Sequence, residues 1–205
     1  MRFHTVLAAL ACLLAPGLSP DPALGQAQGL GFAFQLGYSA LDGEWGDVLD
    51  DGVDGEFNIL WGLGRFRFGG GFNWVSYGLI DPVGEVDSAS QVGTHLSVGY
   101  FLLDRGPILP YLEGRLTHDR LRAEDHVEGF PPPEEEDGNN APRYSGWGGT
   151  AIVGAVVPLR GTVAMDVAVR LGRFVTSEAD LDYLGLGTVS TAVRKGVRLG
   201  VVWHP

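Results

Sequence analysis

His95 and Ser97 are the residues whose types and spacing come nearest to those of a catalytic site. A histidine can act as the base that activates a serine hydroxyl, but the pair also needs a group that orients the histidine. No carboxylate follows Ser97 at a short spacing. We therefore interpret His95 and Ser97 as polar residues of a hydrogen-bonded interior, and we predict no catalytic residue.

The acidic run from Asp47 to Glu56 offers the oxygen ligands that Ca²⁺ prefers. Its spacing is not that of an EF-hand loop, so solvation of a surface loop is the simpler interpretation, and Ca²⁺ binding stays open. Glycine clusters at 69–71 and 148–149 lie within strand patterns and not between a strand and a helix, which gives no support to a phosphate site. We predict no cofactor and no resident metal ion.

The elements that must position these residues are β-strands. Apolar residues recur at every second position in segment after segment, and no stretch sustains the spacing of an amphipathic helix. Eight segments of this kind lie at about 29–41, 55–63, 65–78, 91–103, 108–119, 144–158, 161–175 and 190–203.

The connections between these segments alternate in length. Those at 63–65, 104–106 and 158–161 are tight turns, and the other four are long. Most of the 25 acidic residues fall in the long connections, to which we also assign Asp54, Glu56 and Asp119. Short turns at one end and long loops at the other are typical of outer-membrane barrels, in which the long loops face outward.

The last segment indicates which face meets lipid. One face carries Val197, Leu199, Val201 and Trp203, and the other carries arginines between small residues. A soluble ligand-binding barrel would need the reverse arrangement, with a charged exterior. The sequence therefore predicts an all-β fold: an eight-stranded antiparallel transmembrane β-barrel with short periplasmic turns and long acidic extracellular loops.

The N-terminal residues 1–27 read as a signal peptide, with Arg2 before a short apolar run and small residues near the expected cleavage site. Cys12 lies within the apolar run, so lipidation is a lesser alternative. Residues 28–205 would form one barrel domain. The net charge of −11 argues against a nucleic-acid partner. The Pro-rich, acidic segment at 130–140 is predicted to be a mobile external loop.

The chain resembles the small outer-membrane barrels of the OmpA and OmpX type over residues 29–205. The resemblance rests on the architecture and on the final segment at 194–203. It implies export to the bacterial outer membrane and an assembly signal, formed by Leu199, Val201 and Trp203, for the barrel assembly machinery. That family usually ends on the aromatic residue, whereas His204 and Pro205 follow here.

The outer-membrane lipid A deacylases also carry a His-x-Ser pair, which must face lipid. Here the alternation directs His95 and Ser97 inward, away from such a substrate.

The same alternation places seven charged residues inside the barrel, where eight strands leave room only for side chains. We expect Glu113 and Asp166 each to bridge neighbouring arginines, because unpaired buried charges are costly. Five arginines would face two carboxylates, so loop acids, bound anions or water must balance them. The predicted lumen charge network consists of Arg67, Glu113, Arg115, Asp166, Arg170, Arg194 and Arg198.

Arg173 and Lys195 fall on the lipid face near the expected outer interface. They would contact anionic headgroups of outer-membrane lipids, or merely extend toward water. A plugged, monomeric barrel with a structural or surface-interaction role is the main functional prediction, and its external partner is unknown. A narrow channel or small-molecule conduit is the first alternative, and a lipid-modifying enzyme is the second.

Overall fold

The computed structural model describes residues 29–43, 46, 49–79, 88–123, 143–180 and 188–205. Its strands are β1 (Gly29–Asp42), β2 (Leu49–Leu63), β3 (Phe66–Leu79), β4 (Ser88–Phe101), β5 (Leu109–Ala123), β6 (Arg143–Arg160), β7 (Val163–Asp180) and β8 (Thr188–Trp203). The predicted signal peptide, Cys12 and the Pro-rich segment at 130–140 lie outside the described residues. Within the described residues, no helix is long and apolar enough to cross a membrane.

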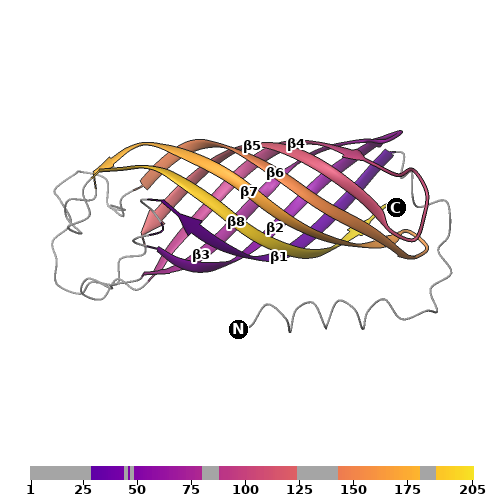
Figure 1. Cartoon of the computed structure of the whole chain (residues 1–205), viewed down its shortest axis with the longest axis horizontal. Helices are drawn as coiled ribbons and strands as arrows, with labels where there is room; N and C mark the ends of the chain where they lie inside the picture. The colour runs from indigo at the N-terminus through magenta and orange to yellow at the C-terminus, as the bar shows by residue number, and fades with distance from the viewer. Residues whose placement is uncertain (1–28, 44–45, 47–48, 80–87, 124–142, 181–187) are drawn as a thin grey trace.

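The strands form one closed antiparallel barrel in sequence order, in which β8 pairs with β1 (Figure 1). Following the Cα partners from Phe32 once around the barrel leads to Asp42, ten residues farther along β1. With eight strands, this offset tilts each strand by about 40° from the barrel axis. The predicted fold of an eight-stranded antiparallel barrel is confirmed.

The turns at 64–65, 102–108 and 161–162 share one end of the barrel with the C-terminus (Figure 1). We call this the short-turn end and the opposite one the long-loop end. Gly64 has a φ of 59° and Gly161 a φ of 61°, and each is the first residue of a two-residue turn. Glycine adopts this backbone conformation without steric cost, and it matches the twist of the flanking strands.

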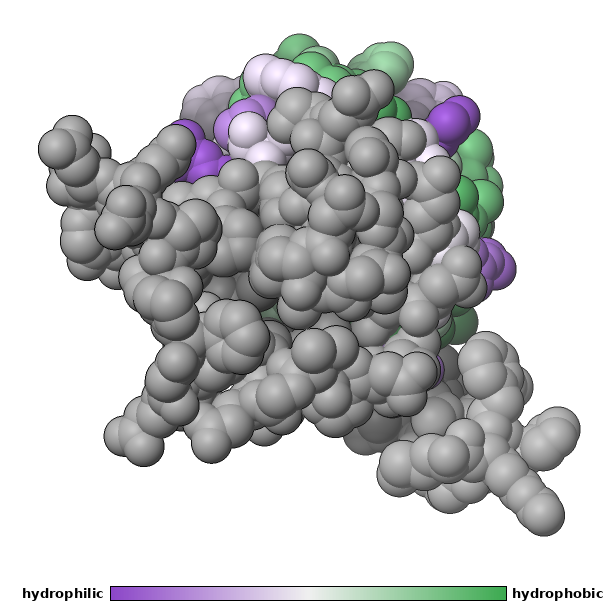
Figure 2. Space-filling model, turned by 90° about the vertical axis from the view of Figure 1, so that its left-hand side faces the viewer, coloured by the Kyte–Doolittle hydropathy of each residue, from purple (hydrophilic) through white to green (hydrophobic). Residues whose placement is uncertain are grey.

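Alternation along every strand separates an apolar outer wall from a mainly polar interior. On β4, for example, Val92, Leu96 and Val98 are exposed on the outer surface, whereas His95 and Ser97 are buried. Seen toward the long-loop end, hydrophobic residues cover much of the visible outer wall that the structure describes (Figure 2). This is the arrangement expected for a barrel surrounded by lipid and not for a soluble ligand carrier.

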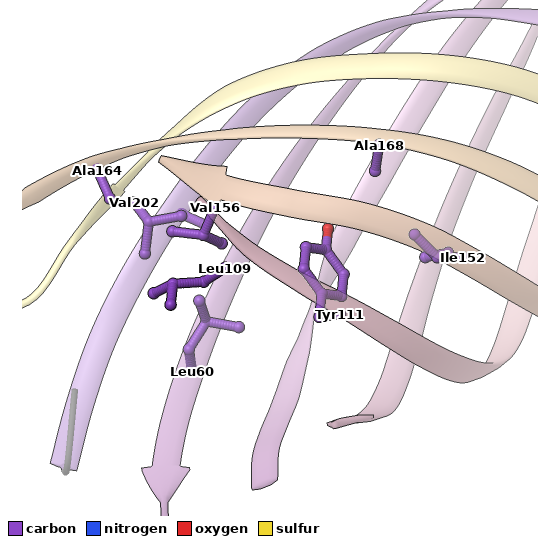
Figure 3. Packing of buried hydrophobic residues seen from close by; sticks show 9 residues of the cluster. Leu60, Leu109, Tyr111, Ile152, Val156, Ala164, Ala168 and Val202 are labelled. Atoms are coloured by element: carbon purple, nitrogen blue, oxygen red, sulfur yellow. The ribbon is translucent and has the colours of Figure 1, made fainter. Parts of the chain in front are cut away.

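The main cluster of apolar side chains in the lumen lies near the short-turn end, although Leu49, Val75 and Tyr77 are buried nearer the long-loop end. Its members come from most of the strands, and in Figure 3 the ring of Tyr111 lies between Leu109 on one side and Ile152 on the other. Phe101 packs against the cluster and meets Tyr111 edge to face, with ring centroids 5.8 Å apart. The cluster, here called the apolar floor, consists of Ala33, Leu60, Leu109, Tyr111, Ile152, Val156, Ala164, Ala168 and Val202. Above it, the interior becomes polar.

Three strands extend at least four residues farther toward the long-loop end than their apolar alternation indicated. Strand β2 begins at Leu49, about six residues before the predicted start. Strand β5 continues to Ala123 and β7 to Asp180, four and five residues beyond their predicted ends. The additional residues mix polar and apolar types without a two-residue period. Their backbone nevertheless continues the inter-strand pairing.

Candidate functional site

The candidate site is the polar part of the lumen, which lies above the apolar floor. The structure buries the side chains of all seven residues of the predicted charge network. Three further acids, Asp54, Glu56 and Asp119, are also buried there. Within the described residues, the lumen thus holds five arginines and five carboxylates.

The centre of this arrangement is a group of four charged residues, here called the central cluster: Glu56, Glu113, Arg115 and Arg198. Glu56 accepts contacts from Arg115 at 2.6 Å and from Arg198 at 2.9 Å. Glu113 lies 2.5 Å from Arg115 and 3.9 Å from Arg198. Each acid therefore contacts both arginines, as expected where charges can be buried only in pairs.

Arg67 joins the central cluster to the apolar floor. Its guanidinium lies 2.7 Å from Glu113 and 3.6 Å from Asp166. The same guanidinium stacks over the ring of Tyr111, 4.3 Å from the ring centroid. Arginine suits this position because its planar group can form ion pairs at its edge and stack on an aromatic ring with its face.

Asp166 was expected to bridge arginines, but neutral donors supply its shorter contacts. Tyr111 donates a hydrogen bond to it at 2.7 Å, and Gln35 donates another at 3.1 Å. Arg67, at 3.6 Å, is its one ion-pair partner within the described residues. Position explains the difference, because Asp166 lies beside the apolar floor, where the Tyr111 hydroxyl is the nearest donor.

Arg170 continues the network toward the long-loop end. It forms an ion pair with Asp54 and lies 3.7 Å from Glu56. Ser39 donates a hydrogen bond to Asp54 at 2.8 Å. Asp54 and Glu56 were assigned to a loop from the sequence, and that assignment was wrong because β2 extends through both positions.

Asp119, Arg194 and Asn73 form a separate group nearer the long-loop end, here called the upper cluster. Arg194 and Asp119 are 3.8 Å apart, and Asn73 donates to Asp119 at 3.3 Å. Each of the three side chains retains a buried polar atom without a hydrogen-bond partner in the described structure. The loop assignment of Asp119 was also wrong, because Asp119 belongs to β5 and is fully buried.

Glycines make space for the buried acids. A Cβ atom at Gly93 would lie 1.8 Å from an oxygen of Asp119, and one at Gly37 would lie 2.6 Å from an oxygen of Asp54. Neither acid could occupy its present position beside a larger residue. The small residues that alternate with arginines in the sequence are therefore part of the lumen arrangement.

His95 and Ser97 lie inside the barrel, as predicted. The Nε2 atom of His95 is 2.5 Å from the amide oxygen of Asn58, and the amide nitrogen of Asn58 donates to Glu56 at 2.8 Å. Both side chains are buried, so neither faces the lipid phase. Within the described residues, no group of three or more His, Cys, Asp or Glu side chains could hold a metal ion. Asp47, which begins the acidic run, is outside those residues.

The predicted lipid contacts, Arg173 and Lys195, both lie on the outer wall and are exposed. Lys195 forms an ion pair with Asp42 of the neighbouring strand, so part of its charge is already compensated. The residues of the proposed assembly signal, Leu199, Val201 and Trp203, also face outward.

Aromatic residues on the outer wall include Trp61, Trp74, Trp147 and Trp203, as expected for interfacial girdles. Tyr77, near the long-loop end of β3, does not belong to this surface. It is buried in the lumen and donates a hydrogen bond to Gln91 at 3.1 Å.

His204 lies at the short-turn end of the barrel, partly buried. Its backbone nitrogen donates to the carbonyl of Thr162 at 2.8 Å, and the Trp203 indole donates to the Thr162 hydroxyl at 3.1 Å. A Cβ atom at Gly31 would lie 2.5 Å from the His204 ring. Partial burial and the charge of Arg67 lower the pKa of His204, which lies beyond the last strand.

No family model matches the chain, and no curated protein matches it. Solved structures do. Neisserial surface protein A is 13% identical, with a TM-score of 0.61, and the match covers 87% of this chain and 98% of that one. The outer membrane protein OprG from Pseudomonas aeruginosa is 12% identical, with a TM-score of 0.52, and the match covers 88% of this chain and 98% of that one. The chain thus has the fold of the small eight-stranded outer-membrane barrels.

Proposed function

We propose that this chain is a bacterial outer-membrane barrel with a structural or surface-interaction role, and that its lumen is plugged by paired charges. One observation carries the proposal: the outer wall is apolar, whereas the interior holds five arginines and five carboxylates within the described residues. Such an inside-out distribution is stable in lipid and would be unfavourable for a soluble barrel.

The central cluster supports a plugged lumen because it spans the interior. Its members come from β2, β5 and β8, and Arg67 extends the same contacts to β3. The apolar floor fills the lumen below this layer, and His204 lies at the same end of the barrel. An ion would have to separate several buried ion pairs to pass, which is costly in an environment of low dielectric constant.

Membrane location is tested first. The protein should fractionate with outer membranes and migrate differently on gels before and after boiling, because a closed barrel has no free edge at which to unfold. Recovery of the protein in the soluble periplasmic fraction would contradict the proposal.

Conductance in planar bilayers then tests the plug. The refolded wild-type protein should show no large, steady single-channel current. The double variant Arg115→Ala with Glu113→Ala removes one acid and one arginine of the central cluster, so net charge is unchanged, and it should admit ions more readily. Large, steady conductance in the wild type would make the protein a channel.

A narrow channel is the second candidate, and the upper cluster favours it. Asn73, Asp119 and Arg194 retain unpartnered polar atoms in the lumen on the side of the long-loop end. An aqueous path would enter there. If the wild type conducts and Asp119→Ala changes only the ion selectivity, the channel function is correct and the plugged lumen is not.

We assign no lipid-modifying activity, since the His95 and Ser97 side chains are buried inside the barrel. We propose that the barrel assembly machinery recognises the outward residues Leu199, Val201 and Trp203 as its signal. After insertion, the outer wall would contact outer-membrane lipids. Trp203→Ala should reduce insertion in cells more than refolding of the purified chain into vesicles. Equal losses in the two assays would indicate a purely structural role for Trp203.

A further inference from the structure

An exposed tryptophan on the outer wall has cationic residues on both of its neighbouring strands. Trp147 of β6 is 61% exposed. His118 of β5 is its direct Cα partner, and the two rings are 4.8 Å apart. Arg120 of β5 and Arg173 of β7 are both exposed on the same surface.

The register places the two arginines symmetrically about Trp147. Arg120 pairs with Ser145, and Arg173 pairs with Gly149, so each arginine is a diagonal neighbour of the tryptophan. Diagonal neighbours on one face of a sheet lie about 7–8 Å apart, within reach of long side chains. Both guanidinium groups can therefore approach one ligand that rests on the indole ring.

The position of this surface relative to the lipid phase follows from the strands themselves. Below Arg173, the outward residues of β7 are apolar from Leu171 down to Val163. Exposed tryptophans of membrane barrels mark the interface between hydrocarbon and headgroups. Arg120 and Arg173 thus lie at the level of the headgroups, on the side of the long-loop end.

The positive charges of Arg120 and Arg173 are also less compensated than the charge of Lys195. Within the described residues, neither Arg120 nor Arg173 forms an ion pair, whereas Lys195 pairs with Asp42. The register also makes Arg122 and Arg143 direct Cα partners one step nearer the rim.

We propose that Arg120, Arg173, His118 and Trp147 form a binding site for the phosphorylated headgroup of an outer-leaflet glycolipid. Two arginine side chains can hold phosphate oxygens with charge-assisted hydrogen bonds. The Trp147 indole and the His118 ring contact the sugar and the upper acyl chains. The proposal rests on the proposed outer-membrane location, in which the long-loop end faces outward. The predicted pair of lipid contacts was Arg173 and Lys195. In the present proposal Arg120 takes the place of Lys195, because Lys195 already forms an ion pair with Asp42.

The experiment uses the mature chain refolded into phosphatidylcholine vesicles that contain either lipid A or phosphatidylglycerol. After gentle extraction, native mass spectrometry counts the lipid molecules retained by each barrel. The wild type should retain lipid A in preference to phosphatidylglycerol. Arg120→Glu with Arg173→Glu should lower the retention of lipid A by at least about tenfold, because two favourable charges become repulsive.

A matched control makes the same change of charge at the other end. Arg65 and Arg105 are exposed in the short-turn connections, so Arg65→Glu with Arg105→Glu should leave lipid A retention within about twofold of the wild type. Equal losses in both double variants, or no loss in the first, would overturn the site. Equal retention of both lipids by the wild type would also overturn it.

The gel shift on boiling separates this result from failure of the proposed function. If no sample shows the shift, the barrel does not insert, and the proposed function fails. If only the charge-reversed variant fails to insert, Arg120→Gln with Arg173→Gln replaces it. That variant should retain several-fold less lipid A than the wild type, and unchanged retention would reject the site.

Discussion

The central and upper clusters contain the same kinds of residue but differ in how completely they are paired. In the central cluster, Glu56 contacts arginines on two different strands at less than 3 Å. In the upper cluster, the Asp119 to Arg194 distance is 3.8 Å and both side chains keep an unpartnered atom, whereas in the central cluster only the Nε of Arg198 has none among the described residues. The central cluster lies next to the apolar floor, where Arg198 donates a hydrogen bond to Tyr111 at 3.0 Å and where unpaired charge is costly.

The difference lies in the closeness of the partners and not in exposure, since Glu56 is 1% and Asp119 is 0% exposed. It also makes the two clusters separable by mutation. Variants of the central cluster should affect stability strongly, whereas variants of the upper cluster should affect it little.

The largest loss is expected for Glu56→Gln. The change leaves Arg115 and Arg198 without their shared carboxylate, so the free energy of unfolding should fall by about 4–5 kcal/mol. Urea titrations of the barrel in lipid vesicles, followed by tryptophan fluorescence, measure the loss. Asp51→Asn on the exposed face of the same strand is the control and should cost less than about 1 kcal/mol.

Asp166→Ala should have a smaller effect, since neutral groups provide its shorter contacts. Tyr111 and Gln35 lose an ionised acceptor and Arg67 loses one of its two carboxylates, so we expect a loss of about 2–3 kcal/mol. The same titration applies. A loss equal to that of Glu56→Gln would show that Arg67 depends on Asp166 more than the 3.6 Å distance suggests.

Asp119→Asn tests the upper cluster directly. The loss should be about 1 kcal/mol or less, because the ion pair with Arg194 is long and removal of a buried charge offsets part of its value. The amide preserves the shape beside Gly93. If this variant is destabilised as strongly as Glu56→Gln, the two clusters do not differ in the way proposed here.

The smallest effect concerns His204 at the short-turn end. Its folded pKa is lowered, so the unfolded chain binds a proton more readily, and stability should decrease as the pH falls through about 6.5. Above that pH, His204 is neutral in both states and makes no such contribution. His204→Gln should flatten this part of the stability profile. An unchanged slope would assign the pH dependence to other groups.

Sequence periodicity predicted the strands well where the outer face is apolar. Arg198 and Glu113 were placed inside because their neighbours on the outer face are apolar. Glu56 and Asp119 were missed because they lie near the ends of the predicted segments 55–63 and 108–119 and were counted with the acids of the long connections, although both strands continue beyond them. Counting every second residue upward from Asn58 would have found Asp54 and Glu56.

The pairing within the lumen could not be predicted from alternation. Periodicity assigns a residue to a face, but the distance between Glu56 and Arg198 depends on the register between β2, β1 and β8. That register depends on the turns and on the ten-residue offset around the barrel. A shift of one residue would move every side chain of a strand to the other face.

The pairing of β8 with β1 has a consequence for the order of events during biogenesis. The first strand to leave the ribosome finds its second partner only in the last, so neither edge of the sheet is satisfied until the whole polypeptide is available. Contacts so distant in sequence form slowly. A prematurely terminated chain would present two unsatisfied edges and should be removed by proteolysis rather than persist as a smaller barrel.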